Sequence, residues 1–495
     1  MRKLIPSPWH GFCLFFIASM PADYGSELVF SYDEMFLTAR LPAEALGLWA
    51  IALVLERRTI AAFALAVTAM ALYPLIGAVS LSMVLLQTTP RVKWWTVFLV
   101  ALAVFTIIEL PAFPSLHLYP FDPQWRELVR YNATNVFPTL WTLNAWSKAC
   151  WAIALPVILY STERPDNRRL WSNLALLGVA GVAICTVADV IGQDALWIQL
   201  QTWRTLWLLT VMQWPAAVVL IRGSGRTRPM LIWLLALRWV LLDIGGGIIA
   251  LYIAVTLLVD LRRDSSPSHA VRFGAIPVRF RNMLIGASLL SAPIWLLWQM
   301  GYHYGRVLYS GRTLEFNVSW LELAVHTRLV IELVAILIVL NLARDRIRIT
   351  SLYLLLAVLF AFAVVNFDQR SAVAKIVEAR VDHPDLAPFG GLVPAGGVVY
   401  WDGRPEEVLY PWLLMKTSSY FSAFQAGGII FHRRTTLEVI RRFGRIKLDE
   451  QASRPPRKAG AADGELTLSH CRLRMRGSPD SPSRSFNIWT SSPSL

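Results

Sequence analysis

Charged residues are scarce in this chain of 495 residues. Asp, Glu, Lys and Arg make up 16% of it, whereas a soluble globular protein contains about 25%. Hydrophobic residues make up 55%. This balance excludes a soluble enzyme, a disordered protein and a disulfide scaffold. Apolar runs of about 20 residues recur along most of the chain, which is typical of a polytopic membrane protein.

Cysteine and nucleotide-binding motifs are scarce as well. There are 4 cysteines and no CxxC pair, so the sequence does not support a zinc site or a disulfide framework. A Walker loop, a Rossmann fingerprint and an HExxH motif are all missing. Gly245-Gly246-Gly247 lies in an apolar segment without a following Lys-Ser or Lys-Thr. We interpret it as a break between two helices.

Apolar segments indicate about thirteen transmembrane helices, or eleven if the shortest do not cross the membrane. We therefore predict an all-α polytopic membrane protein of 11–13 transmembrane helices, with a multi-span domain at 1–366. Met1-Arg2-Lys3 and the apolar stretch behind it are also compatible with a signal peptide, but we favour an uncleaved first span. The candidate segments are 9–19, 43–55, 59–77, 78–90, 94–112, 138–161, 170–191, 203–221, 229–243, 245–261, 281–300, 319–343 and 349–366.

The positions of Lys and Arg predict the orientation, because cytoplasmic loops carry an excess of both. This rule predicts that four loops and everything after residue 366 face outward. The four loops are 20–42, 113–137, 192–202 and 301–318. The net charge of +14 then reflects topology, and we expect no nucleic acid partner. The outward loops hold five cations: Arg40, Arg126, Arg130, Arg306 and Arg312. The inward loops hold eighteen: Arg57, Arg58, Arg91, Lys93, Arg164, Arg168, Arg169, Arg222, Arg226, Arg228, Arg262, Arg263, Arg272, Arg279, Arg281, Arg344, Arg346 and Arg348.

The composition changes after the last span. Residues 367–445 contain glycine pairs, a strand-like run at 398–401 and a basic helical segment at 433–442. We predict a small α+β extracytoplasmic C-terminal domain there. Residues 446–495 are basic, rich in Ser and Pro and without apolar periodicity. They indicate a disordered tail, or a frameshifted reading frame.

Charged residues at the first outward loop are the strongest candidates for a site, because ionisable groups in or beside a span cost free energy. Asp33 and Glu34 could hold a divalent metal ion or act as a general base. Arg40 could bind a phosphate with its fork of donors. The alternatives are a solvated acidic pair and an ordinary helix pair between Arg40 and Glu44. Other cations near the outer face are Arg126, Arg130 and Arg204.

Tryptophan is frequent, with 21 residues. Many of them lie at the ends of spans, where an interfacial aromatic belt explains them. The alternative for a few outward ones, Trp125, Trp197 and Trp401, is stacking on a sugar.

The layout resembles that of GT-C class membrane glycosyltransferases. The acidic stretch at 30–44 is similar to the first outward loop of such bacterial proteins, and two stretches at 394–401 and 420–428 are similar to their extracytoplasmic end. Tyr73-Pro74-Leu75 stands where the class has His-Pro-Leu. The stretches concerned are Phe30-Ser31-Tyr32-Asp33-Glu34, Thr38-Ala39-Arg40, Ala43-Glu44, Pro394-Ala395-Gly396-Gly397-Val398-Val399-Tyr400-Trp401, Tyr420-Phe421-Ser422 and Gln425-Ala426-Gly427-Gly428.

The resemblance implies a bacterial inner-membrane enzyme that takes a sugar from a polyprenyl-phosphate donor. The acceptor would be a saccharide or protein of the cell envelope, on the outer face. Asp33 or Glu34 would be the catalytic acid, base or metal ligand. The expected substrate-binding residues are Arg40, Glu44, Arg126, Arg130, Arg204 and Trp401.

Two other functions remain open. A transporter or flippase would call for inverted repeats with matching broken helices, and one break, at 245–247, is visible. A non-catalytic component of polysaccharide assembly would tolerate substitution of Asp33, Glu34 and Arg40.

Overall fold

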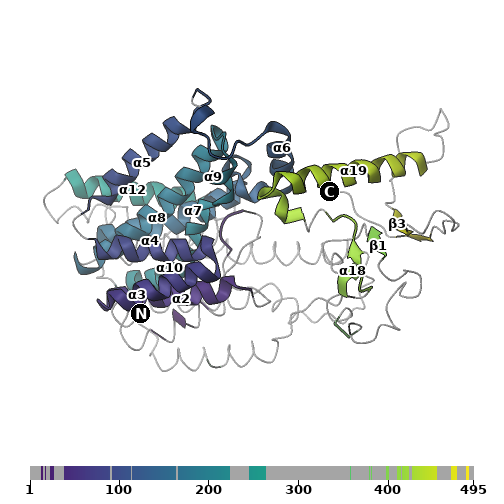
Figure 1. Ribbon diagram of the computed structural model, residues 1–495. Helices are drawn as coiled ribbons and strands as arrows, with labels where there is room; N and C mark the ends of the chain where they lie inside the picture. Colours follow the sequence, from purple (N-terminus) through teal and green to yellow (C-terminus); the bar gives the residue numbers. More distant parts are fainter. Residues whose placement is uncertain are drawn as a thin grey trace, which may run out of the picture. The chain divides into compact units, whose positions relative to one another are not determined.

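The computed structural model describes residues 23–26, 38–89, 92–112, 114–162, 165–222, 245–263, 397–400, 410–413, 415–422 and 426–453, two strands at 470–475 and 486–489, and a few isolated residues. This part of the chain is mostly helical, with few strands (Figure 1). It divides into two compact units. The helical unit comprises Met1–Phe121, Thr134–Gly301 and Trp320–Val365, and the C-terminal unit comprises Asp122–Ala133, Tyr302–Ser319 and Asn366–Leu495.

The helices of the helical unit follow the predicted apolar segments from 43 to 261. The segments predicted at 229–243, 281–300, 319–343 and 349–366, and most of 9–19, lie outside the described residues. The α-helices are α2 (Arg40–Leu55), α3 (Thr59–Leu72), α4 (Pro74–Thr88), α5 (Trp94–Ile108), α7 (Leu143–Thr162), α8 (Pro165–Val190), α9 (Ala195–Gln199), α10 (Leu206–Arg222) and α12 (Gly246–Arg263). Short 3-10 helices connect them: η2 (Pro114–Leu116), η3 (Thr134–Val136), η4 (Pro138–Leu140) and η5 (Thr202–Thr205).

One predicted boundary was wrong. Two spans were predicted to divide between residues 77 and 78, but the helix breaks at Tyr73, whose backbone is extended (φ −147°, ψ 97°). The reason is Pro74, which disfavours helical dihedrals at the residue before it and suits the first position of a new helix. Helices α3 and α4 pack against each other beyond this break. Their approach is so close at Gly77 that a Cβ there would collide with the backbone of Met70.

The turn between α2 and α3 has a left-handed residue that is not glycine. Arg57 has φ 64°, and its N–H donates to Val54 O while the Arg58 N–H donates to Leu53 O. These two bonds form a Schellman motif, whose left-handed position is usually occupied by glycine. The break predicted at 245–247 is confirmed in part, because Gly245 has φ 108° and α12 begins directly after it.

Helix α8 lies at the centre of the helical unit and packs against α4, α7 and α10. Trp171, Leu174 and Cys185 on α8 are completely buried. Among the described helices, only the segment Asn167–Val190 is both long and apolar enough to cross a membrane, and several others are apolar but shorter.

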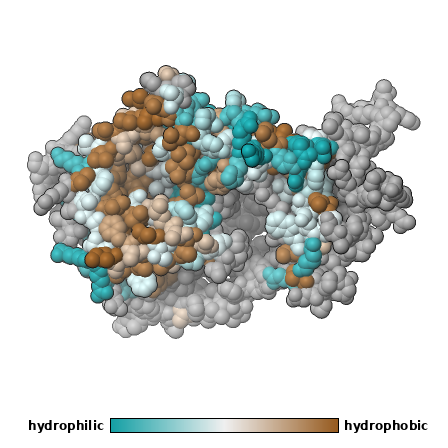
Figure 2. Space-filling view, in the orientation of Figure 1, coloured by the Kyte–Doolittle hydropathy of each residue, from teal (hydrophilic) through white to brown (hydrophobic). Residues whose placement is uncertain are grey.

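The outer helices expose large apolar side chains and bury small ones. On α3 the buried residues are Ala62, Ala66 and Ala69, whereas Ile60 is 88% exposed and Val67 is half exposed. Helix α5 has the same character, since Phe105 is its one buried residue. Figure 2 shows the resulting hydrophobic surface over this unit.

The C-terminal unit combines a short helix from the middle of the chain with elements from its end. Its helices are α6 (Pro123–Asn132), α18 (Tyr410–Leu413), η10 (Ala426–Ile430) and α19 (Arg433–Ser453). Its strands are β1 (Val398–Tyr400), β2 (Ser418–Ser419), β3 (His470–Met475) and β4 (Phe486–Trp489), in the order β2-β1-β3-β4. β1 runs parallel to β2 and antiparallel to β3, and β3 and β4 are antiparallel.

The strand predicted near residue 398 and the basic helix predicted at 433–442 are both confirmed, and the helix extends to Ser453. Strands β3 and β4 fall within 446–495, where the sequence analysis expected a disordered tail. The run from 470 to 475 alternates polar and apolar residues, a pattern that favours a strand and that the Ser- and Pro-rich surroundings obscured.

Candidate anion site in the helical unit

The predicted site residues fall into three groups. Asp33, Glu34 and Trp401 lie outside the described residues. Arg126 and Arg130 lie on α6, in the C-terminal unit. The structure brings Arg40 and Arg204 together in the helical unit, and Glu44 follows one turn after Arg40 on α2. Arg204 is the most buried cation among these residues.

Arg204 lies on η5, directly before α10, and is only 4% exposed. Its Nε donates a hydrogen bond to Gln201 Oε1 at 2.8 Å, and its Nη1 donates to the hydroxyl of Tyr73 at 3.1 Å. A guanidinium stays protonated in proteins and cannot escape burial by losing its charge. The oxygens of Gln201 and Tyr73 therefore orient the cation of Arg204.

Tyr73 joins the two arginines. The guanidinium carbon of Arg204 lies 5.8 Å from the centroid of the Tyr73 ring, and that of Arg40 lies 5.7 Å from the same centroid. Both distances are within the range of a cation–π interaction. Tyr73 was missed as a site residue. The available signal was its position before Pro74, which predicts a break in the helix and hence a residue at a helix end.

The backbone beside Arg204 is in a sparsely populated conformation. Gln201 has φ 45° and ψ 50°, in the left-handed region, and its side chain is buried. For a residue other than glycine this conformation costs about 1–2 kcal/mol. Such residues cluster at functional sites, where the surrounding structure holds them in place. The hydrogen bond from Arg204 to Gln201 is part of what holds this one.

A short segment of the loop that was predicted to face outward, residues 23–26, packs against Trp203. Gly25 has φ 79°, and a Cβ at this position would collide with the Trp203 ring. Tyr24 is buried, and its ring centroid lies 6.2 Å from that of Trp203. Lys148 on α7 pairs with Asp23 at 2.8 Å and fixes the segment to the bundle. The loop that carries the predicted acidic pair thus begins beside the arginines.

Glu44 is buried on α2. Gly47, one turn further, allows α2 to approach Ser80 on α4 and Trp207 on α10 closely. Along α2, Glu44 therefore lies between Arg40 and the closely packed position of Gly47.

A second group of buried carboxylates has a structural explanation. Asp194 accepts hydrogen bonds from the backbone N–H groups of Leu118 (2.6 Å), Tyr119 (3.0 Å) and Leu196 (2.9 Å). Glu109 accepts one from the Gln193 N–H at 3.0 Å. These bonds satisfy backbone donors of two loops and connect the loops to each other. We assign both residues to loop anchoring.

The predicted metal ion has no support from the described residues. No three His, Cys, Asp or Glu side chains of this part of the chain come together in a way that could hold a metal ion. Asp33 and Glu34, the residues proposed to bind one, lie outside it.

In the C-terminal unit, α6 is attached to the elements that precede and form α19. The indole N–H of Trp125 donates to Ile429 O at 2.7 Å, and Arg433 pairs with Asp122 at 2.5 Å. Partial burial works to raise the pKa of Asp122, but the hydrogen bonds from Arg433 and from the Trp125 N–H outweigh it and lower that pKa. Trp125, a candidate for sugar stacking, is 1% exposed and packs inside this unit.

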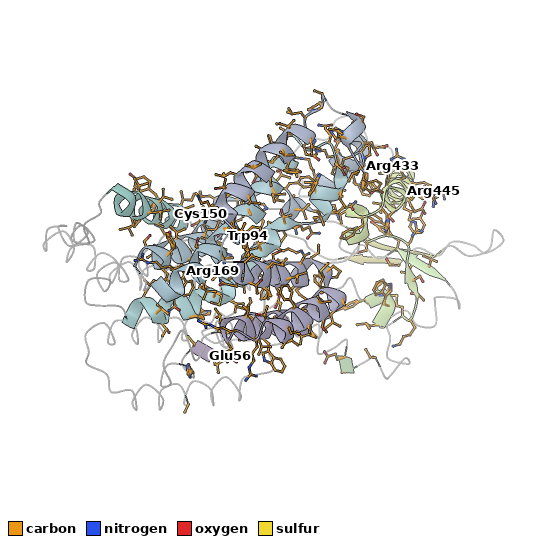
Figure 3. All side chains as sticks on the ribbon, turned by 60° about the vertical axis from the view of Figure 1, so that its left-hand side comes forward. Glu56, Trp94, Cys150, Arg169, Arg433 and Arg445 are labelled. Atoms are coloured by element: carbon orange, nitrogen blue, oxygen red, sulfur yellow. The ribbon has the colours of Figure 1, made fainter. Side chains whose placement is uncertain are left out.

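Helix α19 carries several arginines, and two of them, Arg441 and Arg442, pair with Glu438. Hydrogen bonds from Arg441 and Arg442 hold the pKa of Glu438 at about 2. Arg442 also donates to Tyr420 O at 2.6 Å, which connects the helix to the segment after β2. Figure 3 shows Arg433 and Arg445 on the same helix. These contacts explain the basic composition of the helix as part of its packing and solvation.

Comparison of the chain with protein-family models, with curated proteins and with solved structures finds no match.

Proposed function

We propose that this protein is a polytopic membrane glycosyltransferase that takes a sugar from a polyprenyl-phosphate donor on the outer face of a bacterial inner membrane. The acceptor is a saccharide or protein of the cell envelope. The observation that carries the proposal is the pair of guanidinium groups of Arg40 and Arg204 on one tyrosine ring, at the end of an apolar helical bundle.

The exposed surface of the bundle supports a lipid environment. A helix in water exposes polar residues and buries its large apolar ones. Helix α3 does the reverse, because it buries three alanines and exposes Ile60 and Val67. Small residues at helix contacts and large apolar residues outside are the pattern of helices that pack in lipid.

The arrangement of the helix ends supports the predicted topology. Arg169 Nη2 donates to Leu86 O at 2.7 Å, which brings the start of α8 to the end of α4, beside the predicted cytoplasmic cations. Arg40, Tyr73 and Arg204 lie at the opposite ends of their helices. Helix α6, from the outward loop 113–137, belongs to the same compact unit as α19, which supports one side of the membrane for both.

The lengths of α3 and α4 support a site within the outer leaflet. With 14 and 15 residues they reach about 21–23 Å at 1.5 Å per residue, whereas the hydrocarbon core is about 30 Å thick. A hairpin that starts at the inner surface therefore ends below the outer headgroups. Tyr73 and the two arginines are then within reach of a lipid phosphate that enters from the side.

The acidic pair and the arginine pair have different roles in the proposed reaction. Asp33 or Glu34 takes the proton of the acceptor hydroxyl, whose oxygen forms a bond to the anomeric carbon of the sugar. The bond from that carbon to the phosphate oxygen breaks, and polyprenyl phosphate leaves with the electron pair. Arg40 and Arg204 stabilise the negative charge on the leaving phosphate. A divalent ion held by the acidic pair would add to this stabilisation.

The test is sugar transfer in proteoliposomes that contain radiolabelled polyprenyl-phosphate sugars and envelope saccharides. We expect wild-type protein to release polyprenyl phosphate, and Glu34→Gln or Asp33→Asn to reduce the rate about 100-fold or more, as loss of a general base does. Arg204→Met should also reduce the rate. The matched control Arg58→Ala removes an exposed arginine from the α2–α3 turn and should leave the rate unchanged.

Two results would overturn this function. Movement of the intact donor across the bilayer without cleavage would indicate a flippase. Binding of the donor without transfer to any saccharide or protein fraction would indicate a non-catalytic component. Chelation with EDTA in the same assay tests the divalent ion.

A further inference from the structure

We propose that the exposed side of helix α19 docks on the anionic headgroups of a lipid bilayer. The inference goes beyond the proposed sugar transfer and uses only one part of that proposal, the location of the chain in a membrane. It concerns the C-terminal unit, to which the proposed function assigns no lipid contact.

One side of α19 packs within the C-terminal unit. Thr436 and Ile446 are buried, and the hydroxyl of Thr436 donates to Ile429 O at 3.1 Å. The ring centroid of Phe443 lies 5.8 Å from that of Phe421. Because an α-helix has about 3.6 residues per turn, positions 436, 443 and 446 share one side of it. These contacts hold the helix and leave its opposite side for other partners.

The opposite side of α19 is exposed. Arg434, Leu437, Arg441 and Arg445 follow one another at intervals of three or four residues, which places them in one row along the helix. All four side chains are exposed. Gly444 lies beside this row, and a Cβ added there would meet nothing within 4 Å. The described part of the chain therefore leaves this side open.

The helix keeps a positive charge after its ion pairs are counted. Between residues 434 and 445 it carries four arginines and one glutamate, a net charge of +3. A guanidinium stays protonated in proteins, and its fork of donors matches the geometry of a phosphate. The exposed side of α19 therefore complements a surface of anionic phosphate groups.

Two observations favour a bilayer over a soluble acidic partner. Leu437 is exposed within the row of arginines, and an apolar side chain among cations is typical of helices that lie in the membrane interface. The ion pair between Arg433 and Asp122 joins α19 to α6, and α6 belongs to the loop 113–137 between two predicted spans. The chain itself thus keeps lipid headgroups at a high effective concentration for this helix.

The test places a fluorescent amino acid at Leu437 of the full-length protein and measures its quenching by nitroxide-labelled lipid headgroups. The protein is assembled into nanodiscs of phosphatidylcholine alone, or of phosphatidylcholine with phosphatidylglycerol. The quenched fraction gives the docking equilibrium. We expect stronger quenching with phosphatidylglycerol, and we expect added salt to weaken it, because salt screens exposed charges.

Gly444 offers a matched pair of variants. Gly444→Lys and Gly444→Glu both add a long side chain at an open position, and Lys and Glu have similar helix propensities. Any effect on folding is therefore shared, whereas the added charges are opposite. One cation near an anionic surface changes binding by about 5-fold. The docking equilibria of the two variants should therefore differ by about 25-fold, and Gly444→Lys should dock better.

The outcomes separate the inference from the function. Equal quenching in the two lipid compositions, or in the two variants, would refute the docking of α19 on anionic lipid. Loss of quenching on addition of dextran sulfate, without any dependence on phosphatidylglycerol, would indicate an acidic polysaccharide as the partner and would also refute it. Sugar transfer without docking leaves the proposed function intact. A protein that does not enter nanodiscs would refute the membrane location, and both proposals would fail.

Discussion

Replacing Trp125 by alanine should detach α6 from α19 within the C-terminal unit. Trp125 is 1% exposed, and its indole N–H donates to Ile429 O at 2.7 Å. Truncation of a buried tryptophan costs about 3–5 kcal/mol. A domain as a whole is stable by about 5–15 kcal/mol, so this change removes a large part of the stability of a small unit.

Hydrogen exchange of the protein in lipid nanodiscs measures the effect. The amides of α19 between 433 and 446 should lose protection by about 100-fold or more, because 3–5 kcal/mol corresponds to at least that factor in an opening equilibrium. The matched control is Tyr131→Ala, an 84% exposed residue on α6, the helix that carries Trp125. It should leave the protection of α19 unchanged.

Unchanged protection of α19 in Trp125→Ala would refute the reasoning. It would mean that α6 is not part of the folded unit that contains α19. The support for placing the loop 113–137 and the C-terminal unit on the same side of the membrane would then be lost.

Three further predictions concern stability. Arg57→Gly should stabilise the helical unit by about 1 kcal/mol, because glycine adopts the left-handed conformation without strain; a lower melting temperature in detergent would contradict this. Ala66→Leu should destabilise the helical unit by about 1–3 kcal/mol, because the larger side chain overpacks a buried position. Val67→Leu, on the exposed side of the same helix, should have no effect. Equal melting temperatures of the two variants would contradict this packing. The lowered pKa of Asp122 means that its interaction with Arg433 contributes stability above the unfolded pKa near 4 and loses it as the pH falls through the folded pKa. Asp122→Asn should remove this acid dependence of exchange in α19, and an identical pH profile would refute it.

The sequence predicted the helices well where apolar runs ended at cationic turns, as at Arg57 and Arg58. It failed at Tyr73, because the hydropathy stays high across this residue and into α4. Only Pro74 marks the break, and a single proline does not distinguish a kink from a separation of two helices.

The candidate site was predictable in its charges but not in its neutral members. Arg40 and Arg204 were noticed because an arginine near a span is costly. Tyr73 and Gln201 carry no such signal. Their role depends on contacts such as that between Tyr73 and Arg204, which are 131 residues apart in the sequence. The burial of Trp125 likewise depends on Ile429, 304 residues away.

The most direct test of the central claim is retention of polyprenyl phosphate by the purified protein, measured by native mass spectrometry in the presence of excess phosphatidylglycerol. We predict that wild type and Arg58→Ala retain the polyprenyl phosphate, and that Arg204→Met and Arg40→Ala lose it. Equal retention by all four proteins, or no preference over phosphatidylglycerol in any of them, would contradict the assignment of Arg40 and Arg204 to a lipid-phosphate site.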